Sequence, residues 1–169
     1  MRMDPTRVAV LTISDGVVAG TRQDGSGDAI ARWAATRGHT VVAREAVADE
    51  SDRITTALLR LADSGDADLL VTTGGTGFTA RDVTPEATLP VLERMAPGIA
   101  EAIRAQGAAL GTPFAWLSRG VSGIRGRTLI VNLPGSPGGV RDALSVLDLV
   151  LAHAVQLLRN IETSRHERT

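Results

Sequence analysis

A glycine-rich loop, Gly74-Gly75-Thr76-Gly77, follows directly after the apolar stretch 68–73. Glycines let backbone N–H groups approach phosphate oxygens and accept left-handed backbone conformations, so this loop suits an anionic ligand. The hydroxyl groups of Thr72 and Thr73 stand beside it. The alternative is a tight turn that only the fold requires, but the position after a buried strand favours binding.

A second loop of this kind, Pro134-Gly135-Ser136-Pro137, follows the apolar stretch 127–133. It combines a glycine, a hydroxyl that can cap a helix and a proline that can open one, and the N-terminus of a helix favours an anion. Two such loops suit a polyphosphate or two phosphorylated ligands.

Two carboxylates, Asp49 and Asp82, lie in loops that follow predicted strands. They could approach one Mg²⁺ through oxygen ligands, as a metal–nucleotide complex requires. The alternatives are an ion pair with Arg81 or a helix cap for Asp82, and a turn or cap for Asp49.

Three larger side chains follow in the segment 114–119. Arg119 could hold a phosphate with both guanidinium nitrogens, or it could be a solvated surface charge. Phe114 and Trp116 could flank a flat heterocycle, or they could be buried in the core.

The composition removes several mechanisms. The sequence has no cysteine, and all 18 of its basic residues are arginines. A thiolate nucleophile, a cysteine-ligated zinc, a Schiff-base lysine and a P-loop lysine are therefore excluded. The three histidines, His39, His153 and His166, have no ligand spacing, so acid–base chemistry and Mg²⁺ binding fall mainly on carboxylates.

Length and charge limit the class of protein. A chain of 169 residues with 43% hydrophobic and 22% charged residues predicts a single domain over 1–169, with a core at about 8–160 and a polar tail at about 162–169. The net charge of −1 gives no field that would attract nucleic acid or an anionic membrane. No signal peptide or membrane span is evident, which predicts a cytoplasmic protein.

Strands and helices are expected to alternate along the chain. The predicted strands are 8–13, 40–47, 68–73, a short one at 114–118, and 127–133. The predicted helices are 26–38 with Ser26 as cap, 51–65 with Ser51 as cap, one from Thr84 through Leu89, Leu92 and Met95, 99–110, and a long one at 140–158.

This alternation predicts an α/β fold, a three-layer α/β/α sandwich with a mostly parallel sheet. Ligands of such folds bind beyond the carboxyl ends of the strands. Four loops should therefore converge on one rim: Ser14-Asp15-Gly16, Ala48-Asp49-Glu50, the 74–77 loop with Asp82, and the 134–137 loop.

The same motifs resemble those of a known family. Residues 72–77 and 81–87 (TTGGTG and RDVTPEA) are similar to the central signature of the molybdopterin-binding family of MogA/MoaB type. Leu117-Ser118-Arg119 with Gly123, and residues 132–137 (NLPGSP), resemble its second half. Ile13-Ser14-Asp15 and residues 24–27 (DGSG) resemble its first strand and loop, so the likeness extends over about 8–160.

The resemblance implies the same three-layer fold, a homotrimer and a role in molybdenum cofactor biosynthesis. It implies transfer of AMP from Mg-ATP to the terminal phosphate of molybdopterin, with possible hand-over to the molybdate-inserting protein. Asp49 and Asp82 match the family's acidic residues for Mg²⁺ and catalysis. The matching binding positions are Ser14, Asp15, Thr73, Gly74, Gly75, Thr76, Gly77, Ser118, Arg119, Asn132, Pro134, Gly135 and Ser136.

Two departures stand against this likeness: Gly138-Gly139 replaces the larger or basic residue that many members carry there, and no proline precedes Asp49 in Val47-Ala48-Asp49. Three classes remain open: a nucleotidyltransferase, a non-catalytic molybdopterin carrier of the same fold, and an unrelated nucleotide-binding domain. The sequence has no G-x-G-x-x-G after the first strand, which argues against the unrelated nucleotide-binding domain. The transferase needs no strong base, because a phosphate monoester is already largely ionised at neutral pH.

Overall fold

The computed structural model describes residues 5–160, which form an α/β fold around one six-stranded sheet in the order β2-β1-β3-β6-β5-β4. The strands β2, β1, β3 and β6 are parallel to one another, and β5 and β4 are antiparallel to their neighbours. Their bounds are β1 Arg7–Ile13, β2 Thr40–Val47, β3 Leu69–Thr73, β4 Arg94–Met95, β5 Ser122–Arg125 and β6 Thr128–Leu133.

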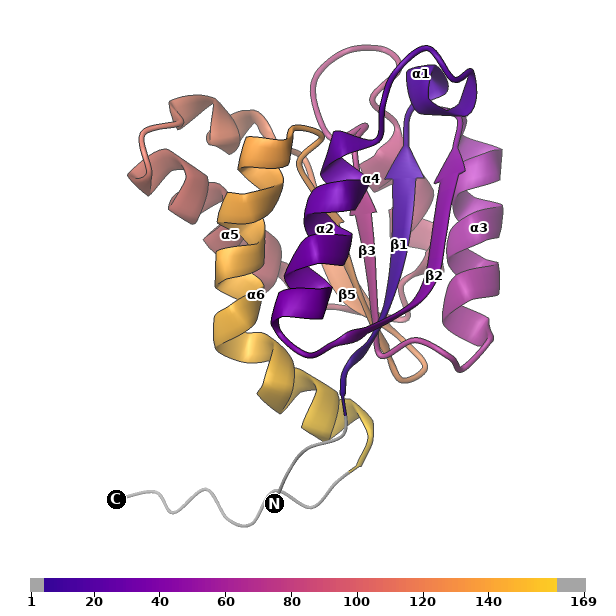
Figure 1. Cartoon of the computed structure of the whole chain (residues 1–169), viewed down its shortest axis with the longest axis vertical. Coiled ribbons are helices and arrows are strands. Elements are labelled where there is room, and N and C mark those ends of the chain that lie inside the picture. Colours follow the sequence, from indigo (N-terminus) through magenta and orange to yellow (C-terminus); the bar gives the residue numbers. More distant parts are fainter. Residues whose placement is uncertain (1–4, 161–169) are drawn as a thin grey trace.

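Helices cover both faces of this sheet (Figure 1). Their bounds are α1 Asp15–Val18, α2 Gly25–Thr36, α3 Ser51–Asp63, α4 Thr84–Thr88, α5 Pro97–Ala109 and α6 Pro137–Leu158, with 3₁₀ turns η1 Leu89–Val91 and η2 Pro113–Leu117. One core cluster joins the sheet to α2, α5 and α6, and the other joins it to α3 and α4. The expected three-layer α/β/α sandwich with a mostly parallel sheet is confirmed.

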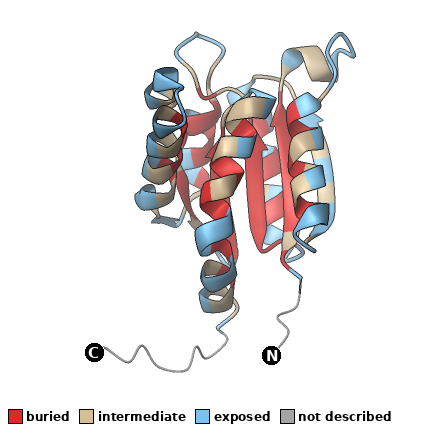
Figure 2. Cartoon of the chain, turned by 60° about the vertical axis from the view of Figure 1, so that its left-hand side comes forward, coloured by how far each residue is buried: buried red, intermediate tan, exposed pale blue. Residues whose placement is uncertain are grey.

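The alternation of side chains along β1 explains why helices are needed on both faces. Val8 and Val10 enter the first cluster, whereas Ala9 and Leu11 enter the second. Figure 2 shows the buried residues along the strands and on the helix surfaces that face them. A strand that is apolar on both faces is stable only between two layers.

The region from Leu89 to Met95 is not a helix, so that prediction was wrong. α4 ends at Thr88 and is followed by η1 and then β4. Pro90 has no N–H to donate to the carbonyl four residues earlier, so the α-helical bonds stop and the chain continues as the 3₁₀ turn η1, after which Leu92 is extended. Met95 then pairs with Gly123 of β5, a strand that the periodicity did not predict.

The short strand expected at 114–118 was also wrong, because Pro113 opens η2 there. The N–H of Ala115 donates to the carbonyl of Thr112 at 2.9 Å, and that of Ser118 donates to Ala115 at 3.1 Å. These local bonds replace the pairing with another strand that the prediction required.

Neither predicted serine cap forms. Asp24 caps α2 by accepting from the N–H of Gly27, and Ser26 instead donates to the carbonyl of Gly135 at 2.6 Å. α3 begins at Ser51, but its cap position is Glu50, which makes no side-chain cap bond. The predicted tail at 162–169 lies outside the described residues, and the single domain over 1–169 stays a prediction.

Candidate active site

The carboxyl ends of β1, β2 and β3 point to the same end of the molecule, where α1 lies (Figure 1). A cavity of about 460 Å³ opens there, which we call the Asp49 cavity. All four predicted loops contribute to it. The predicted site residues in its lining are Ser14, Asp49, Thr73, Gly74, Gly75, Asp82, Gly135 and Ser136.

A second cavity of about 560 Å³, the Ser118 cavity, adjoins the first. Gly75, Asp82, Gly135 and Ser136 line both cavities and therefore form a shared wall. Thr76, Gly77, Ser118 and Pro134 are the other predicted site residues in its lining. Phe114, Leu117 and Ile103 add apolar surface there, so the second cavity can accept a flat, partly apolar group.

The 74–77 loop needs its glycines because backbone and side chains close in on it. Gly74 has φ of 100°, and a Cβ there would lie 2.3 Å from the carbonyl oxygen of Ile13. Gly75 has φ of 66°, and its Cβ would lie 2.3 Å from the hydroxyl of Thr84. That hydroxyl donates to the carbonyl of Gly74 at 2.9 Å. A larger residue at either position must displace the loop that separates the cavities.

Asp49 is held by a reciprocal pair of hydrogen bonds with Asp15. The N–H of Asp15 donates to Oδ2 of Asp49 at 2.8 Å, and the N–H of Asp49 donates to Oδ1 of Asp15 at 3.0 Å. Arg81 forms an ion pair with the other oxygen of Asp15 at 2.6 Å. Hydrogen bonds from Arg81 and from Asp49 lower the pKa of Asp15 below its usual value. Asp15 therefore orients Asp49 and does not itself line the cavity.

Asp82 does not pair with Arg81. Its Oδ2 accepts from the N–H and the hydroxyl of Thr79, at 2.8 and 2.7 Å. Gly77 passes so close that a Cβ there would lie 2.9 Å from the same oxygen. The carboxylate is thus fixed between a tight turn and the glycine-rich loop.

The two carboxylates suit a divalent cation. In the described part of the chain, Oδ1 of Asp49 and Oδ1 of Asp82 have no hydrogen bond, although the other oxygen of each is engaged. No cluster of three or more metal-binding side chains is found among residues 5–160. Carboxylate oxygens are ligands that a hard cation such as Mg²⁺ takes, and this ion usually completes its shell with water and substrate phosphates.

Arg119 takes a role that neither sequence interpretation included. Its Nε donates to the carbonyl of Gly77 at 2.7 Å, and its terminal nitrogens bind the carbonyl of Asp82 and the carboxylate of Glu86. Its backbone N–H also donates to Thr76 at 2.9 Å. Arg119 lines neither cavity and instead ties together both ends of the loop that carries Asp82.

Asn132 likewise lies outside both cavities. It is buried, and its amide donates to the hydroxyls of Thr72 and Thr88 while its oxygen accepts from the N–H of Val121. Phe114 and Trp116 are 76% and 66% exposed, so the alternative of core burial was wrong for both. Phe114 lines the Ser118 cavity, whereas Trp116 does not.

The 134–137 loop is fixed from three sides. The hydroxyl of Thr73 donates to the carbonyl of Pro134 at 2.7 Å, and Ser26 bonds Gly135. The hydroxyl of Ser136 accepts from the N–H of Gly139 at 3.1 Å and so caps α6. The first turn of α6 is thereby directed to the shared wall.

Sequence reasoning missed several residues that line the cavities. Arg22, Gln23 and Asp24 line the Asp49 cavity, and Arg104 and Arg141 line the Ser118 cavity. Asp24 stands in residues 24–27 (DGSG), which resemble the family, but it was not among the predicted site residues. The other four positions carried no motif. Only the tertiary arrangement distinguishes them from other surface residues.

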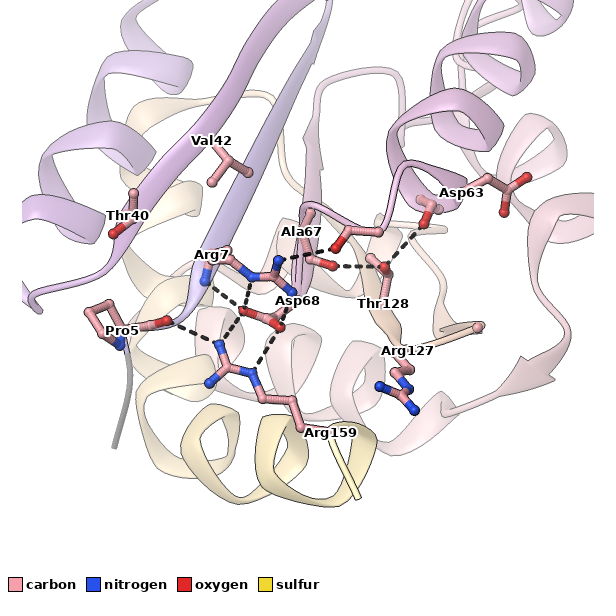
Figure 3. A pocket seen from close by; sticks show the side chains of 13 residues that line it. Pro5, Arg7, Thr40, Val42, Asp63, Ala67, Asp68, Arg127, Thr128 and Arg159 are labelled. Atoms are coloured by element: carbon pink, nitrogen blue, oxygen red, sulfur yellow. Dashed lines mark hydrogen bonds and ion pairs between the residues drawn. The ribbon is translucent and has the colours of Figure 1, made fainter. Parts of the chain in front are cut away.

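A larger cavity of about 860 Å³ lies at the other end of the sheet, where β1 and β3 begin (Figure 3). Its centre is an ion cluster in which the buried Asp68 binds Arg7 at 3.0 Å and Arg159 at 2.6 Å. Arg159 also bonds the carbonyl of Pro5. This cluster joins the two ends of the described chain and is separate from the predicted site residues.

The chain matches the family model for a probable molybdopterin binding domain over residues 9–153. It belongs to this molybdopterin-binding family. It is 39% identical to the molybdopterin adenylyltransferase of Helicobacter pylori strain J99 over 158 residues, covering 92% of this chain and 89% of that protein. It is 39% identical to the enzyme of that name from Escherichia coli K12 over 144 residues, covering 84% and 73%.

Solved structures of molybdopterin biosynthesis proteins have the same fold as this chain. The molybdopterin biosynthesis enzyme MoaB of Thermus thermophilus superposes with a TM-score of 0.86 at 48% identity, covering 92% of this chain and 97% of that one. The molybdopterin biosynthesis Mog protein of Mycobacterium ulcerans gives 0.83 at 42% identity, covering 90% and 99%. No helix within residues 5–160 is both long and apolar enough to cross a membrane.

Proposed function

We propose that this chain is a molybdopterin adenylyltransferase that transfers AMP from Mg-ATP to the terminal phosphate of molybdopterin. The observation that carries the proposal is the pair of adjoining cavities with a shared wall that contains Asp82. A transferase has to hold two substrates next to each other, whereas a carrier needs one site. The names of the curated relatives support the same activity.

The polar Asp49 cavity suits the triphosphate of the nucleotide, because it contains both carboxylates and both glycine-rich loops. Mg²⁺ held by Asp49 and Asp82 would neutralise phosphate charge there. The Ser118 cavity suits the pterin, since it offers Phe114 and Leu117 to a flat ring.

The reaction needs positioning more than it needs a base. A phosphate oxygen of molybdopterin forms a bond to the α-phosphorus of ATP, and the bond from that phosphorus to the bridging oxygen of the diphosphate breaks. The products are adenylyl-molybdopterin and diphosphate. The attacking monoester is already largely ionised near pH 7. The rate acceleration therefore comes mainly from aligning the two substrates and neutralising phosphate charge.

The purified protein, incubated with molybdopterin, ATP and Mg²⁺, should form adenylyl-molybdopterin and release diphosphate in equal amounts, and chelation of Mg²⁺ should stop both. Calorimetry separates this activity from the carrier alternative. A transferase should bind Mg-ATP whether or not molybdopterin is bound. A protein that binds molybdopterin but ignores millimolar ATP would be a carrier, and the proposal would be wrong.

We also propose a homotrimer in a cytoplasmic location, as the family resemblance implies. Large apolar side chains that are exposed in the single chain and line neither cavity support an assembly: Leu110, Trp116 and Leu149. Hand-over of the product to the molybdate-inserting protein stays a prediction.

A further inference from the structure

The arginines at the two cavities differ in whether their guanidinium groups are already occupied. Arg104 lines the Ser118 cavity, but it donates to the carbonyls of Ser118 and Gly120 at 3.2 and 2.9 Å. Arg22 in the Asp49 cavity and Arg141 in the Ser118 cavity have no side-chain hydrogen bond or ion pair within residues 5–160. Each cavity therefore carries one arginine that is available for a ligand.

Nine other arginines of the described chain form ion pairs with Asp or Glu: Arg7, Arg37, Arg44, Arg53, Arg60, Arg81, Arg119, Arg125 and Arg159. Arg32, Arg94 and Arg127 also have no side-chain hydrogen bond or ion pair within residues 5–160, but they line neither cavity. Arg22 and Arg141 differ from these three by their place in the cavity linings. Asp49 and Asp82 stand in the same lining as Arg22 without forming an ion pair with it.

Arg22, which lines the Asp49 cavity, packs its stem against Gly16. A Cβ on Gly16 would lie 3.2 Å from Cβ and 3.7 Å from Cδ of Arg22, so the stem of Arg22 lies against a residue without a side chain. The backbone N–H of Arg22 donates to the carbonyl of Gly16 at 3.1 Å and holds the two residues together.

Arg141 extends back along α6 toward the shared wall. Its terminal nitrogen lies 3.8 Å from the place where a Cβ on Gly138 would be, so the guanidinium covers the open surface left by that glycine. The capping residue Ser136 and Gly139 line the same cavity. A cationic group thus stands beside the first turn of α6, in the lining of the Ser118 cavity.

We propose that these two arginines divide the phosphates between the substrates: Arg141 binds the terminal phosphate of molybdopterin, and Arg22 binds the phosphates of the nucleotide. The inference rests on the proposed function and adds two substrate-binding residues to it. A guanidinium presents paired N–H donors that match phosphate oxygens, so each arginine can orient its phosphate as well as attract it. The two phosphates would meet at Asp82.

The test measures each substrate separately by calorimetry with the full chain, using Mg-ATP alone and molybdopterin alone. Arg141→Gln should weaken molybdopterin binding by about tenfold or more and change the affinity for Mg-ATP less than about twofold. Arg22→Gln should do the reverse. Arg141→Lys and Arg22→Lys should recover part of the lost affinity, because the charge remains while the paired donors do not.

Arg32→Gln is the matched control, since Arg32 is an exposed arginine of α2 outside both cavities and its loss changes the net charge by the same amount. It should leave both affinities unchanged. Equal effects of all three glutamine variants would mean a general charge effect and overturn the inference. The inference would also be overturned if both variants kept wild-type affinities. It would be overturned as well if Arg141→Gln weakened Mg-ATP binding and Arg22→Gln weakened molybdopterin binding.

Failure of this inference can be told apart from failure of the proposed function. If the wild-type chain binds both substrates and transfers AMP but the variants bind normally, only the assignment of the arginines is wrong. If the wild-type chain binds no nucleotide, the transferase proposal and the assignment fall together. Circular dichroism of each variant should match the wild type, because both arginines are exposed and their side chains make no hydrogen bond or ion pair within residues 5–160.

Discussion

Asp15 and Asp49 each accept a hydrogen bond from the backbone N–H of the other, at 3.0 and 2.8 Å, although 34 positions separate them in the chain. This reciprocal pair fixes the loop after β2 to the start of α1, and it leaves Oδ1 of Asp49 available. Asp15→Ala removes the acceptor for Asp49, so we expect about tenfold slower AMP transfer. Single-turnover rates at saturating substrates would measure this loss.

Two variants separate the pairing from the charge of Asp15. Asp15→Asn keeps an acceptor oxygen for the N–H of Asp49 and should retain most of the activity. Arg81→Gln breaks an exposed ion pair, which is worth little, and should change the rate less than about threefold. If Asp15→Ala transfers AMP as fast as the wild type, the pair has no role in the reaction.

Asp82→Ala should fold normally and lose at least about 100-fold in transfer rate, or about 3 kcal/mol, because a proposed Mg²⁺ ligand disappears at the shared wall. Asp82→Asn is the sharper variant, since it keeps an acceptor for Thr79. Asp66→Ala, an exposed carboxylate next to the ion cluster of Asp68, serves as control and should keep full activity. Wild-type turnover in Asp82→Asn would assign this residue a structural role only.

Gly75→Ala tests the conformation of the glycine-rich loop. A methyl group there meets both a left-handed φ of 66° and the hydroxyl of Thr84. Gly38→Ala is a matched control, because Gly38 has φ of 72° but open space around it. We expect Gly38→Ala to cost about 1 kcal/mol of unfolding free energy and to keep activity, and Gly75→Ala to cost more and to lose it. Urea unfolding measures the stability of both variants, and activity assays run in parallel. If crowding at Gly75 is unimportant, Gly75→Ala and Gly38→Ala should lose the same stability and keep the same activity.

Asp68 makes the stability depend on acid pH. Burial alone would raise its pKa, but hydrogen bonds from Arg159 and Arg7 outweigh this and hold the pKa well below the usual value. A carboxylate with a depressed pKa stabilises the fold above its unfolded-state pKa of about 3.9, and this contribution is lost as the pH falls below that value. Asp68→Asn should therefore be about 3 kcal/mol less stable at pH 7.

This difference between Asp68→Asn and the wild type should shrink steadily below about pH 4, as protonation removes the same charge from the wild type. Urea unfolding at several pH values would measure it. A difference that stays constant down to about pH 2 would show that the charge of Asp68 does not stabilise the fold.

The proposed assembly is tested by light scattering at micromolar concentration. For a trimer, the mass derived from light scattering should be about three times the monomer mass of 17.6 kDa. A mass that stays at the monomer value would rule out the trimer, and twice that value would replace it with a dimer. Mass photometry at nanomolar concentration would show whether the assembly persists on dilution.

Local chemistry made many of the elements predictable. The apolar stretch 8–13 is buried on both faces as its composition required, and the glycines at 74 and 75 adopt the left-handed conformations that their residue type allows. Leu89, Leu92 and Met95 have helical spacing, but Pro90 lies among them and lacks the N–H that a continuing α-helix requires. β4 and β5 are too short for periodicity to indicate, and they exist because each pairs with a neighbour.

Residue types and their spacing were enough to predict the α/β alternation, the two glycine-rich loops and the need for carboxylates in a chain without cysteine or lysine. Which polar side chains reach a cavity, and which bind other parts of the protein, became clear from the folded arrangement alone. Arg119 and Asn132 stand in family motifs but bind the chain itself, whereas Arg22 and Arg141 stand in no predicted site and line the cavities. The physical reason is that a hydrogen bond depends on distance and direction between residues far apart in sequence, and residue type alone specifies neither.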